Sequence, residues 1–356
     1  MSRWRLLSSS ADPLRRWVVV GAVTLVSITL ALFVGPATGD RGVVVVYTAL
    51  DEAFSRPIFE QFSRNTGIIV RAKYDTESTK SVGLTQAILA ERARPRCDVF
   101  WNNEIVNTLR LEQAGLLEEY ASQRAGDFPE QYRSAESLWH GFAARARVLV
   151  VNTELVSDTD RPSSITDLAD PQWRGKVGIA KPLSGTTASH AACLFVAWGQ
   201  TRAERFFLDV RKNARILGGN KQVAQAVARG ELAFGLTDTD DAIIEQENGW
   251  PVAIVIPDQA EDQLGTLLIP NTVSIIRGAP HLESARVLVD YLLSPEVEKQ
   301  LATGPSAQIP LGRSVNQSSR IGLAPTTRSM QVDFQAAAAE WETTARFLRR
   351  VFTSAD

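Results

Sequence analysis

The chain has 356 residues, which is long enough for two domains that each bury a core of their own. Hydrophobic residues make up 44% of the chain and charged residues 22%, and these values exclude a chain that is disordered throughout. The formal net charge of -2 gives no electrostatic reason to expect a nucleic-acid partner.

The first 40 residues have the pattern of an export segment. Four arginines precede an apolar run at residues 17–34, as in a secretory signal peptide. The run is also about as long as a membrane span, so residues 1–40 are predicted to be either a signal peptide or an N-terminal membrane anchor. Because positive charge stays on the cytoplasmic side, the rest of the chain is expected to be periplasmic or extracytoplasmic in both cases.

From Val43 onward, short β-rich runs alternate with longer segments of helical period. This alternation predicts an α/β fold with mixed, mostly parallel sheets. The first expected helix ends at Gly67, a residue suited to the position after a helix C-terminus. In this first part we expect strands at 43–47, 68–70 and 97–101, and helices before Gly67, around 82–89 and at 104–115.

The expected strand at 145–152 has no helix directly before it, which marks a crossing between two lobes. The run at 267–276 is a second crossing, in the opposite direction. We therefore expect residues 41–144 and 270–356 to form a discontinuous lobe 1 and residues 145–269 to form lobe 2, joined by a hinge. The other expected strands are at 176–180, 232–236 and 252–256, and the helices follow 184–187 and 220 and span 202–212, 242–247, 281–293, 295–301 and 330–352.

The chain lacks the motifs of common enzyme classes. Cys97 and Cys193 lie in apolar segments and are expected to be buried without a chemical role. The three histidines show no paired zinc spacing, and no Gly-x-Ser-x-Gly, phosphate-loop or dinucleotide-binding motif occurs in the folded part. We therefore predict that the protein is not an enzyme.

Polar residues follow several of the expected strands. In open parallel sheets, ligands bind beyond the carboxyl ends of the strands, and two lobes could each supply half of a site. The polar runs are Thr48 to Asp51, Asn102-Asn103-Glu104, Ser184-Gly185-Thr186-Thr187, Gly219-Asn220 and Thr237-Asp238-Thr239-Asp240-Asp241.

Two of these runs have both a binding and a capping interpretation. The run 184–187 precedes an apolar helix, where backbone N–H groups favour an anion, but serine and threonine are also common helix N-caps. The run 237–241 holds three carboxylates, a density that suits a hard cation or an ammonium group. The same acids could instead cap the next helix, with Thr237 and Asp240 in a variant capping box.

Five segments of the chain resemble the ferric-iron-binding branch of the bacterial solute-binding proteins that serve ABC importers. The resemblance covers about residues 42–315 and implies a type II periplasmic-binding fold, a two-lobed clamp with a hinge. The segments are VVVYTALDEAFSRPIFEQFSRNTGI, CDVFWNNEIVNTLRLEQAGLLEEY, LADPQWRGKVGIAKPLSGTTASHAA, GNKQVAQAVARGELAFGLTDTDDA and LIPNTVSIIRGAPHLESARVLVDYLLSPEVE.

The resemblance implies roles for particular residues. The glutamate that holds metal in the family matches Glu104, with Asn103 beside it, and the histidine position falls at Asp51. The tyrosine pair of the family falls at about Thr239 and Asp240, so the phenolates that select ferric iron are absent. The anion that accompanies iron in the family would be held by Ser184, Gly185, Thr186 and Asn220.

The leading hypothesis from the sequence is a monomeric solute-binding component of an ABC importer. Its cargo would be a metal ion such as iron, carried with a synergistic anion and delivered to a permease, with no resident cofactor. One alternative is a small organic solute such as a phosphonate, carboxylate or amine; a less favoured one is an exported metal-dependent hydrolase. The candidate ligand residues are Thr48, Asp51, Asn103, Glu104, Ser184, Gly185, Thr186, Asn220, Asp238 and Asp240, with Glu104 and Asp240 as metal ligands.

Overall fold

The computed structural model describes residues 42–75, 79–324 and 326–353. The export segment expected in residues 1–40 lies outside the described residues. The strands are β1 (Val43–Thr48), β2 (Ile69–Tyr74), β3 (Val99–Asn102), β4 (Leu117–Glu118), β5 (His140–Asn152), β6 (Val177–Ala180), β7 (Arg215–Leu217), β8 (Phe234–Asp238), β9 (Val252–Val255) and β10 (Leu268–Ile276).

The helices alternate with these strands, as the sequence predicts for an α/β fold. The α-helices are α2 (Glu52–Thr66), α3 (Val82–Ala90), α4 (Val106–Gln113), α5 (Gly185–Trp198), α6 (Gln200–Asn213), α7 (Asn220–Ala228), α8 (Thr239–Glu247), α9 (Leu282–Leu292), α10 (Pro295–Thr303), α11 (Phe334–Ala339) and α12 (Trp341–Thr353). Short 3-10 turns are η1 (Ala125–Asp127), η2 (Glu130–Tyr132), η3 (Asp158–Asp160), η4 (Ile165–Ala169) and η5 (Pro171–Trp173).

The strands form a mixed sheet in the order β2-β1-β3-β10-β5-β8-β6-β7, with β4 beside β10 and β9 beside β5. The pairs β1–β2, β1–β3, β6–β7 and β6–β8 are parallel, as expected for βα units. Every pair that includes β5 or β10 is antiparallel, so the sheet has more antiparallel pairs than the sequence predicts. The difference arises because the two crossing strands run against both sets of parallel strands.

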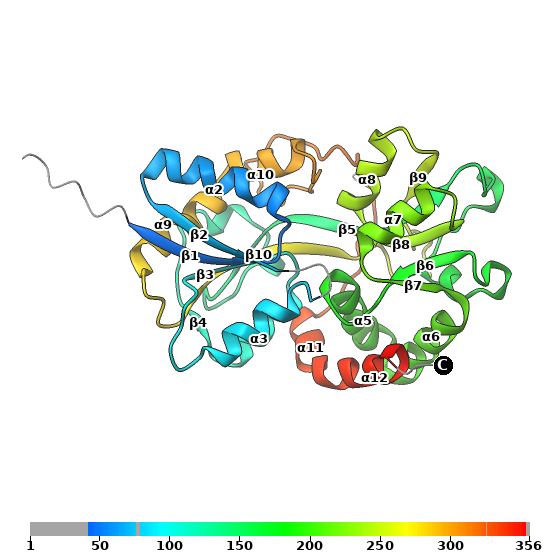
Figure 1. The fold of residues 1–356 in the computed structure, drawn as a ribbon, viewed down its shortest axis with the longest axis horizontal. Coiled ribbons are helices and arrows are strands. Elements are labelled where there is room, and N and C mark those ends of the chain that lie inside the picture. The colour runs from blue at the N-terminus through cyan, green and yellow to red at the C-terminus, as the bar shows by residue number, and fades with distance from the viewer. Residues whose placement is uncertain (1–41, 76–78, 325, 354–356) are drawn as a thin grey trace, which may run out of the picture. The chain divides into compact units, whose positions relative to one another are not determined.

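Strand β5 connects the two parts of the sheet, as Figure 1 shows. Its first half pairs with β10 up to Ala146, and its second half pairs with β8 from Arg147, which lies opposite Asp238. This change of partner falls close to the expected lobe boundary, and the boundaries themselves stay a prediction. β5 is fully buried, and its pairing with β10 shifts register between Pro270 and Asn271, where Ala143 of β5 is left without a partner residue.

Local sequence signals explain the first βα unit. In α2, Ile58, Phe59 and Phe62 recur at helical spacing and are buried against β1 and its neighbours. Gly67 follows the helix with a φ of 77°, and its N–H donates to the carbonyl of Ser63. Because such a backbone conformation strains residues with a Cβ atom, glycine is the residue expected there.

The C-terminal region differs from the single helix expected at 330–352. The helix begins at Phe334, and a break at Glu340 divides it into α11 and α12. α11 packs on α4 and α5, and α12 packs on α5 and α6, which lie in the expected second lobe. Because α4 belongs to the expected first lobe, the chain end contacts both expected lobes, and its assignment to the first lobe stays a prediction.

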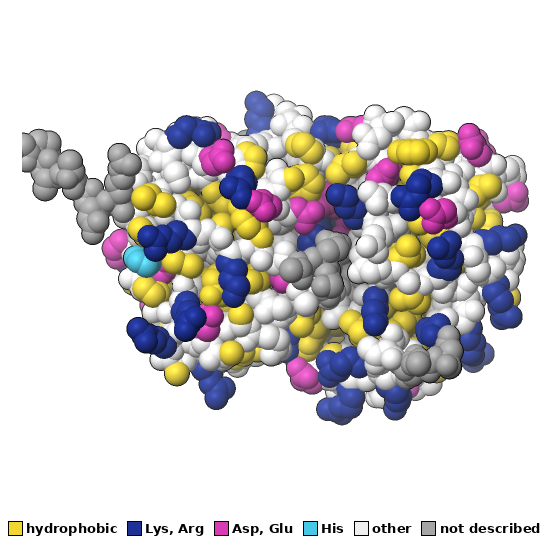
Figure 2. All heavy atoms as spheres, in the orientation of Figure 1, with side chains coloured by type: hydrophobic (Ala, Val, Ile, Leu, Met, Phe, Trp, Pro, Cys, Tyr) yellow, Lys and Arg dark blue, Asp and Glu magenta, His cyan; other side chains and the backbone are white. Residues whose placement is uncertain are grey.

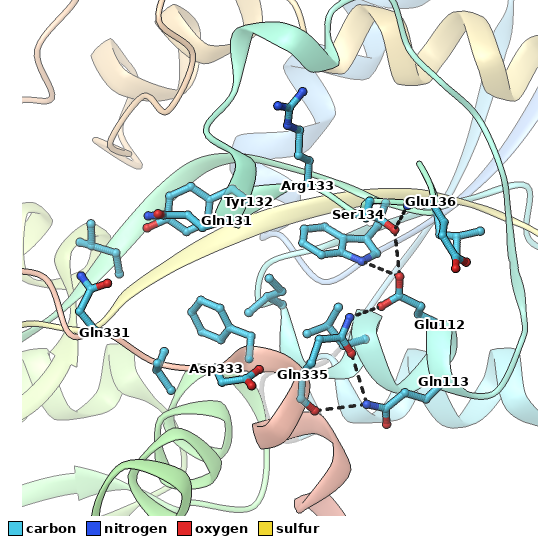
Figure 3. A pocket seen from close by; sticks show the side chains of 18 of the residues that line it. Glu112, Gln113, Gln131, Tyr132, Arg133, Ser134, Glu136, Gln331, Asp333 and Gln335 are labelled. Carbon is cyan, nitrogen blue, oxygen red and sulfur yellow. Dashed lines mark hydrogen bonds between the residues drawn. The ribbon is translucent and has the colours of Figure 1, made fainter.

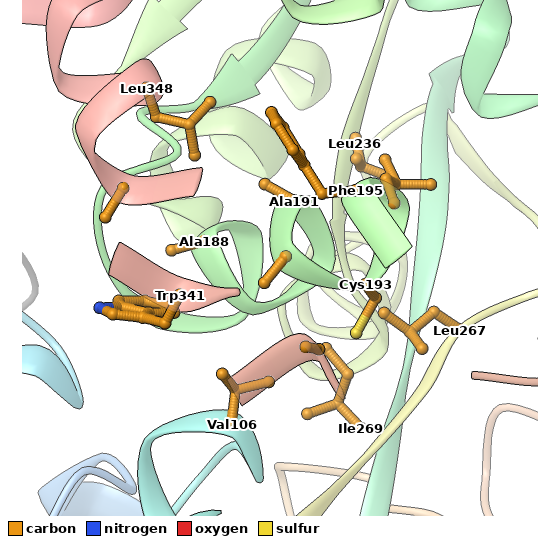
Figure 4. Close-up of a cluster of buried hydrophobic side chains, with 14 of the residues drawn as sticks. Val106, Ala188, Ala191, Cys193, Phe195, Leu236, Leu267, Ile269, Trp341 and Leu348 are labelled. Atoms are coloured by element: carbon orange, nitrogen blue, oxygen red, sulfur yellow. The ribbon is translucent and has the colours of Figure 1, made fainter. Parts of the chain in front are cut away.

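The hydrophobic core that includes the C-terminal helices draws on distant parts of the chain. Figure 4 shows Val106 of α4, Cys193 and Phe195 of α5 and Leu348 of α12 in one cluster. Phe195 and Phe347 have ring centroids 5.7 Å apart, so α12 closes this core from outside. Among the helices of the described ranges, none is both long and apolar enough to span a membrane.

Candidate functional site

A small cavity lies where the carboxyl ends of the strands meet the helices that follow them. Its volume is about 20 Å³, room for a single water molecule, so larger cargo could enter only if the lining residues separated. The lining residues come from segments on both sides of the β5 crossing. They are Asp51, Lys80, Asn103, Arg145, Ala180, Lys181, Ser184 to Thr187, Gly218 to Asn220, Asp238, Asp240 and Asp241.

This cavity brings together all the predicted ligand residues except two, Thr48 and Glu104. Thr48 is fully buried, and its Oγ1 accepts a hydrogen bond from the backbone N–H of Leu50 at 3.2 Å. It therefore shapes the turn after β1 and does not line the cavity.

Glu104 is buried to 0% exposure, and its carboxylate already has several donors. Asn102 Nδ2 donates to it at 2.8 Å, the backbone N–H of Asn107 at 3.2 Å, and Ser189 Oγ at 2.5 Å. Ser189 lies in α5, so this carboxylate joins the turn after β3 to a helix on the other side of the crossing. A metal would have to displace these donors before Glu104 could bind it.

Asp238, at the end of β8, accepts hydrogen bonds from several side chains. Arg147 Nη1 lies 2.6 Å from Oδ1, whereas Arg145 Nη1 lies 3.2 Å and Thr186 Oγ1 2.6 Å from Oδ2. Asn220 Nδ2 donates to Oδ2 at 3.1 Å. Burial alone would raise the pKa of Asp238, but Arg147, Arg145 and the Thr186 hydrogen bond together hold it below its ordinary value.

Asp240, in the first turn of α8, has a different environment. Its Oδ2 lies 3.4 Å from Arg145 Nη1, and its Oδ1 accepts the backbone N–H of Asp241 at 3.1 Å. Burial, with the nearby charges of Asp238 and Asp51, raises the pKa of Asp240 to about 6 although Arg145 opposes the shift. Carboxylate oxygens of Asp238, Asp240 and Asp241 lie within 4.8 Å of one another, the spacing of ligands around one cation.

Asp51 and Lys80 form an ion pair at the edge of the cavity. Lys80 Nζ lies 2.5 Å from Asp51 Oδ1, and the carbonyl of Lys80 accepts the backbone N–H of Gly185 at 2.9 Å. The second contact joins the segment before α3 to the start of α5, and therefore helps to hold the two sides of the cavity together.

Helices α2, α5, α7 and α8 begin at the cavity. The N–H groups of a first helical turn have no partner inside the helix, and the helix dipole adds partial positive charge there. Neither Ser184 nor Asp238 makes a side-chain cap hydrogen bond to its helix, whereas Asp240 accepts the backbone N–H of Asp241 in the first turn of α8. Thr237 instead donates to the carbonyl of Asn220 at 3.1 Å.

The sequence reasoning missed Lys80, Arg145 and Arg147. A signal for the two arginines was present, because Arg145 and Arg147 alternate with alanine and valine in a strand that is otherwise apolar. A charged side chain in a buried strand needs a buried partner, and the carboxylates of 238–241 were the available ones.

A second, larger cavity of about 650 Å³ lies apart from the small cavity described above, between α4, the segment before β5 and the segment before α11. Figure 3 shows Glu112 at one end of it, where Ser134 and Gln335 donate to its carboxylate. None of the predicted ligand residues lines this cavity.

A family model described as bacterial extracellular solute-binding protein matches residues 106–333. The chain belongs to this family. Among its relatives, "Iron uptake protein A2" of Synechocystis sp. is 25% identical over 303 residues, which cover 82% of this chain and 84% of the relative. The expected resemblance to iron-binding relatives is thereby confirmed.

Solved structures confirm the type II clamp fold of this solute-binding protein. Iron-bound HitA from Pseudomonas aeruginosa superposes with a TM-score of 0.77 and 23% identity, covering 87% of this chain and 99% of HitA. AfuA from Actinobacillus pleuropneumoniae, with fructose-6-phosphate bound, superposes with a TM-score of 0.78 and 22% identity, covering 89% of this chain and 100% of AfuA. One fold thus carries a metal ion in one neighbour and a sugar phosphate in another.

Proposed function

We propose that this protein is the extracytoplasmic component of an ABC importer, and that its cargo is a small organic solute carrying an anionic group such as phosphate or carboxylate. The protein would close around this solute and deliver it to a membrane permease. This cargo was the alternative hypothesis from the sequence. The observation that favours it over a metal is the pairing of Asp238 and Asp240 with arginines.

The charges around the cavity balance. The carboxylates of Asp51, Asp238, Asp240 and Asp241 in the lining are matched by Lys80, Lys181 and Arg145 of the lining and by Arg147, which pairs with Asp238 from outside the lining. A ferric or divalent ion binds where carboxylates are left in excess, because it must replace its hydration shell with anionic oxygens. A balanced site suits a solute with little charge of its own beyond one anionic group.

The anionic group of the cargo would bind at the start of α5. Backbone N–H groups of Thr186 and Thr187 lie in the first turn of this helix, and Lys181 lines the same cavity. The starts of α7 and α8 add two more positive dipole ends. A hydroxyl or ammonium group elsewhere on the cargo would hydrogen-bond to Asp240 or Asp241.

A thermal-shift and calorimetric screen of the exported domain tests this proposal. The panel contains sugar phosphates, phosphonates, carboxylates and polyamines, together with ferric, ferrous, manganese and zinc ions, with and without carbonate or phosphate. A ligand that binds the folded state raises the melting temperature by mass action. The proposal requires an organic anion to stabilise the protein and is overturned if none does.

Two lysines that flank β6 provide a matched pair of variants. Lys181→Gln removes a cation from the cavity, and we expect about a tenfold loss of affinity for the anion found in the screen. Lys176→Gln makes the same change at the other end of the strand, at an exposed position outside the cavity lining, and should leave the affinity unchanged. Equal effects of the two substitutions would contradict the placement of the anion.

A metal ion, carried with or without a synergistic anion, is the second candidate cargo. The spacing of the Asp238, Asp240 and Asp241 oxygens favours it, as do the relatives whose names refer to iron. The guanidinium of Arg145 would first have to leave these carboxylates. Stabilisation by a metal in the screen, and none by organic anions, would select this candidate.

A further inference from the structure

The side chain of Arg145 lies among the groups that would hold a cationic cargo. Its Nη1 is 3.2 Å from Asp238 Oδ2 and 3.4 Å from Asp240 Oδ2, and its Nη2 donates to the carbonyl of Asn103. Asn103 lies in the turn after β3, whereas the two aspartates lie at the β8–α8 junction. One guanidinium therefore contacts both sides of the cavity at once.

The pairing of β5 with β8, together with the neighbouring side chain of Arg147, fixes the position of Arg145. Residues 145 and 147 lie on the same face of β5, since successive side chains of a strand alternate between faces. The register of β5 on β8 sets Arg147 opposite Asp238, where its Nη1 binds Oδ1 at 2.6 Å. Arg147 thus occupies one edge of the Asp238 carboxylate, and Arg145 is left with the other oxygen and with Asp240.

Arg145 Nη1 approaches two of the three carboxylates that could together hold a cation. The carboxylates of Asp238 and Asp240 could share a metal ion, and each has an oxygen that approaches this nitrogen. Burial alone would lower the pKa of Arg145, but Asp240 and Asp238 raise it above its ordinary value, so the group stays charged at all working pH values. A metal ion at this place would meet a fixed positive charge.

We propose that Arg145 is the specificity-determining residue of the cleft: a built-in cation that occupies the carboxylates of Asp238 and Asp240 and excludes metal ions as cargo. This inference rests on the proposed function, because it explains how a cavity with clustered carboxylates serves an organic anion. Discrimination by an unfavourable contact with the wrong ligand is a general route to specificity. A purely structural role for Arg145 predicts a loss of stability alone, without any new ligand.

The test is a gain of metal binding. Arg145→Met removes the charge while it keeps an unbranched chain, and should bind Tb³⁺ and Mn²⁺ about a hundredfold more tightly than the wild-type protein, measured by terbium luminescence and calorimetry. Arg145→Met combined with Asp240→Asn removes one of the carboxylates and should lose the gained affinity. Lys80→Met, which removes another cation of the same cavity and leaves Asp238 and Asp240 paired, should bind metal no better than wild type.

Several results would overturn the proposal. One is that Arg145→Met is folded, as checked by circular dichroism, and binds Tb³⁺ no more tightly than the wild-type protein does. If Arg145→Met is unfolded in metal-free buffer, Tb³⁺ must restore its native spectrum, and no restoration would also contradict us. If Arg145→Met gains metal affinity while no organic anion binds the wild-type protein, the specificity role of Arg145 is supported and the proposed organic cargo is wrong.

Discussion

The buried ion pairs at the end of β8 lead to a prediction about stability. Asp238 has a side chain only 2% exposed, and it faces Arg147 at 2.6 Å and Arg145 at 3.2 Å, whose side chains are 1% and 4% exposed. Asp238→Asn preserves the shape of the side chain, so it creates no cavity, but it leaves two buried guanidinium groups with less negative charge. Removing one partner of a buried ion pair costs about 3–5 kcal/mol. We expect the free energy of unfolding to fall by about that amount, a large fraction of the stability of most proteins.

Urea-induced unfolding, followed by circular dichroism, measures this change. The matched control is Asp209→Asn, the same substitution in an exposed pair with Lys212 on α6, where the oxygen and nitrogen are 3.3 Å apart. An exposed pair contributes less than about 1 kcal/mol. If Asp238→Asn lowers the free energy of unfolding no more than Asp209→Asn does, the arginines do not depend on Asp238 and the described network is wrong.

Three further predictions concern single groups. Because the pKa of Asp240 in the folded protein is about 6, above its ordinary value of 3.8, the folded state binds this proton more tightly than the unfolded state. Its contribution to stability therefore falls as the pH rises from about 4 to about 6. Over this pH range the urea midpoint of unfolding should fall less for Asp240→Asn than for the wild-type protein. Burial raises the pKa of both Cys97 and Cys193, so a thiol reagent should label neither in the native protein and both in urea, and rapid native labelling would contradict their burial. Phe347→Ala removes a ring that packs against Phe195, and should lower the free energy of unfolding by about 3–5 kcal/mol; a change below 1 kcal/mol would mean that α12 is not docked on α5.

The order of most elements could be predicted from the sequence, because the signals are local, but the short strands β4 and β7 were not expected and β5 begins at His140 instead of 145. Apolar spacing in α2 and the glycine after it define a helix without reference to the rest of the chain. The same holds for the polar runs after β3, β6 and β8, since a strand end is visible where an apolar run stops. The cavity that collects Asp51, Asn103 and the run 184–187 follows from those strand ends.

The tertiary structure decided what each polar side chain does at that place. Glu104 follows its strand as expected, yet its carboxylate turns toward Ser189 and away from the cavity. Asn102 and the backbone N–H of Asn107 are local donors to this carboxylate, but the contact that joins it to α5 comes from Ser189, 85 residues away in the chain. The position of α12 on α5 and α6 was likewise invisible, since an amphipathic helix reveals that one face is buried but not what covers it.

The carboxylates of 237–241 show the same division most clearly. The order of residues alone shows that three acids gather at the start of a helix, and so that a cation would be near them. Only the register of β5 on β8 decided that the cation is supplied by the chain itself, through Arg145 and Arg147. Register depends on pairing between distant strands, and a shift by one residue would have turned both arginines to the opposite face of the sheet.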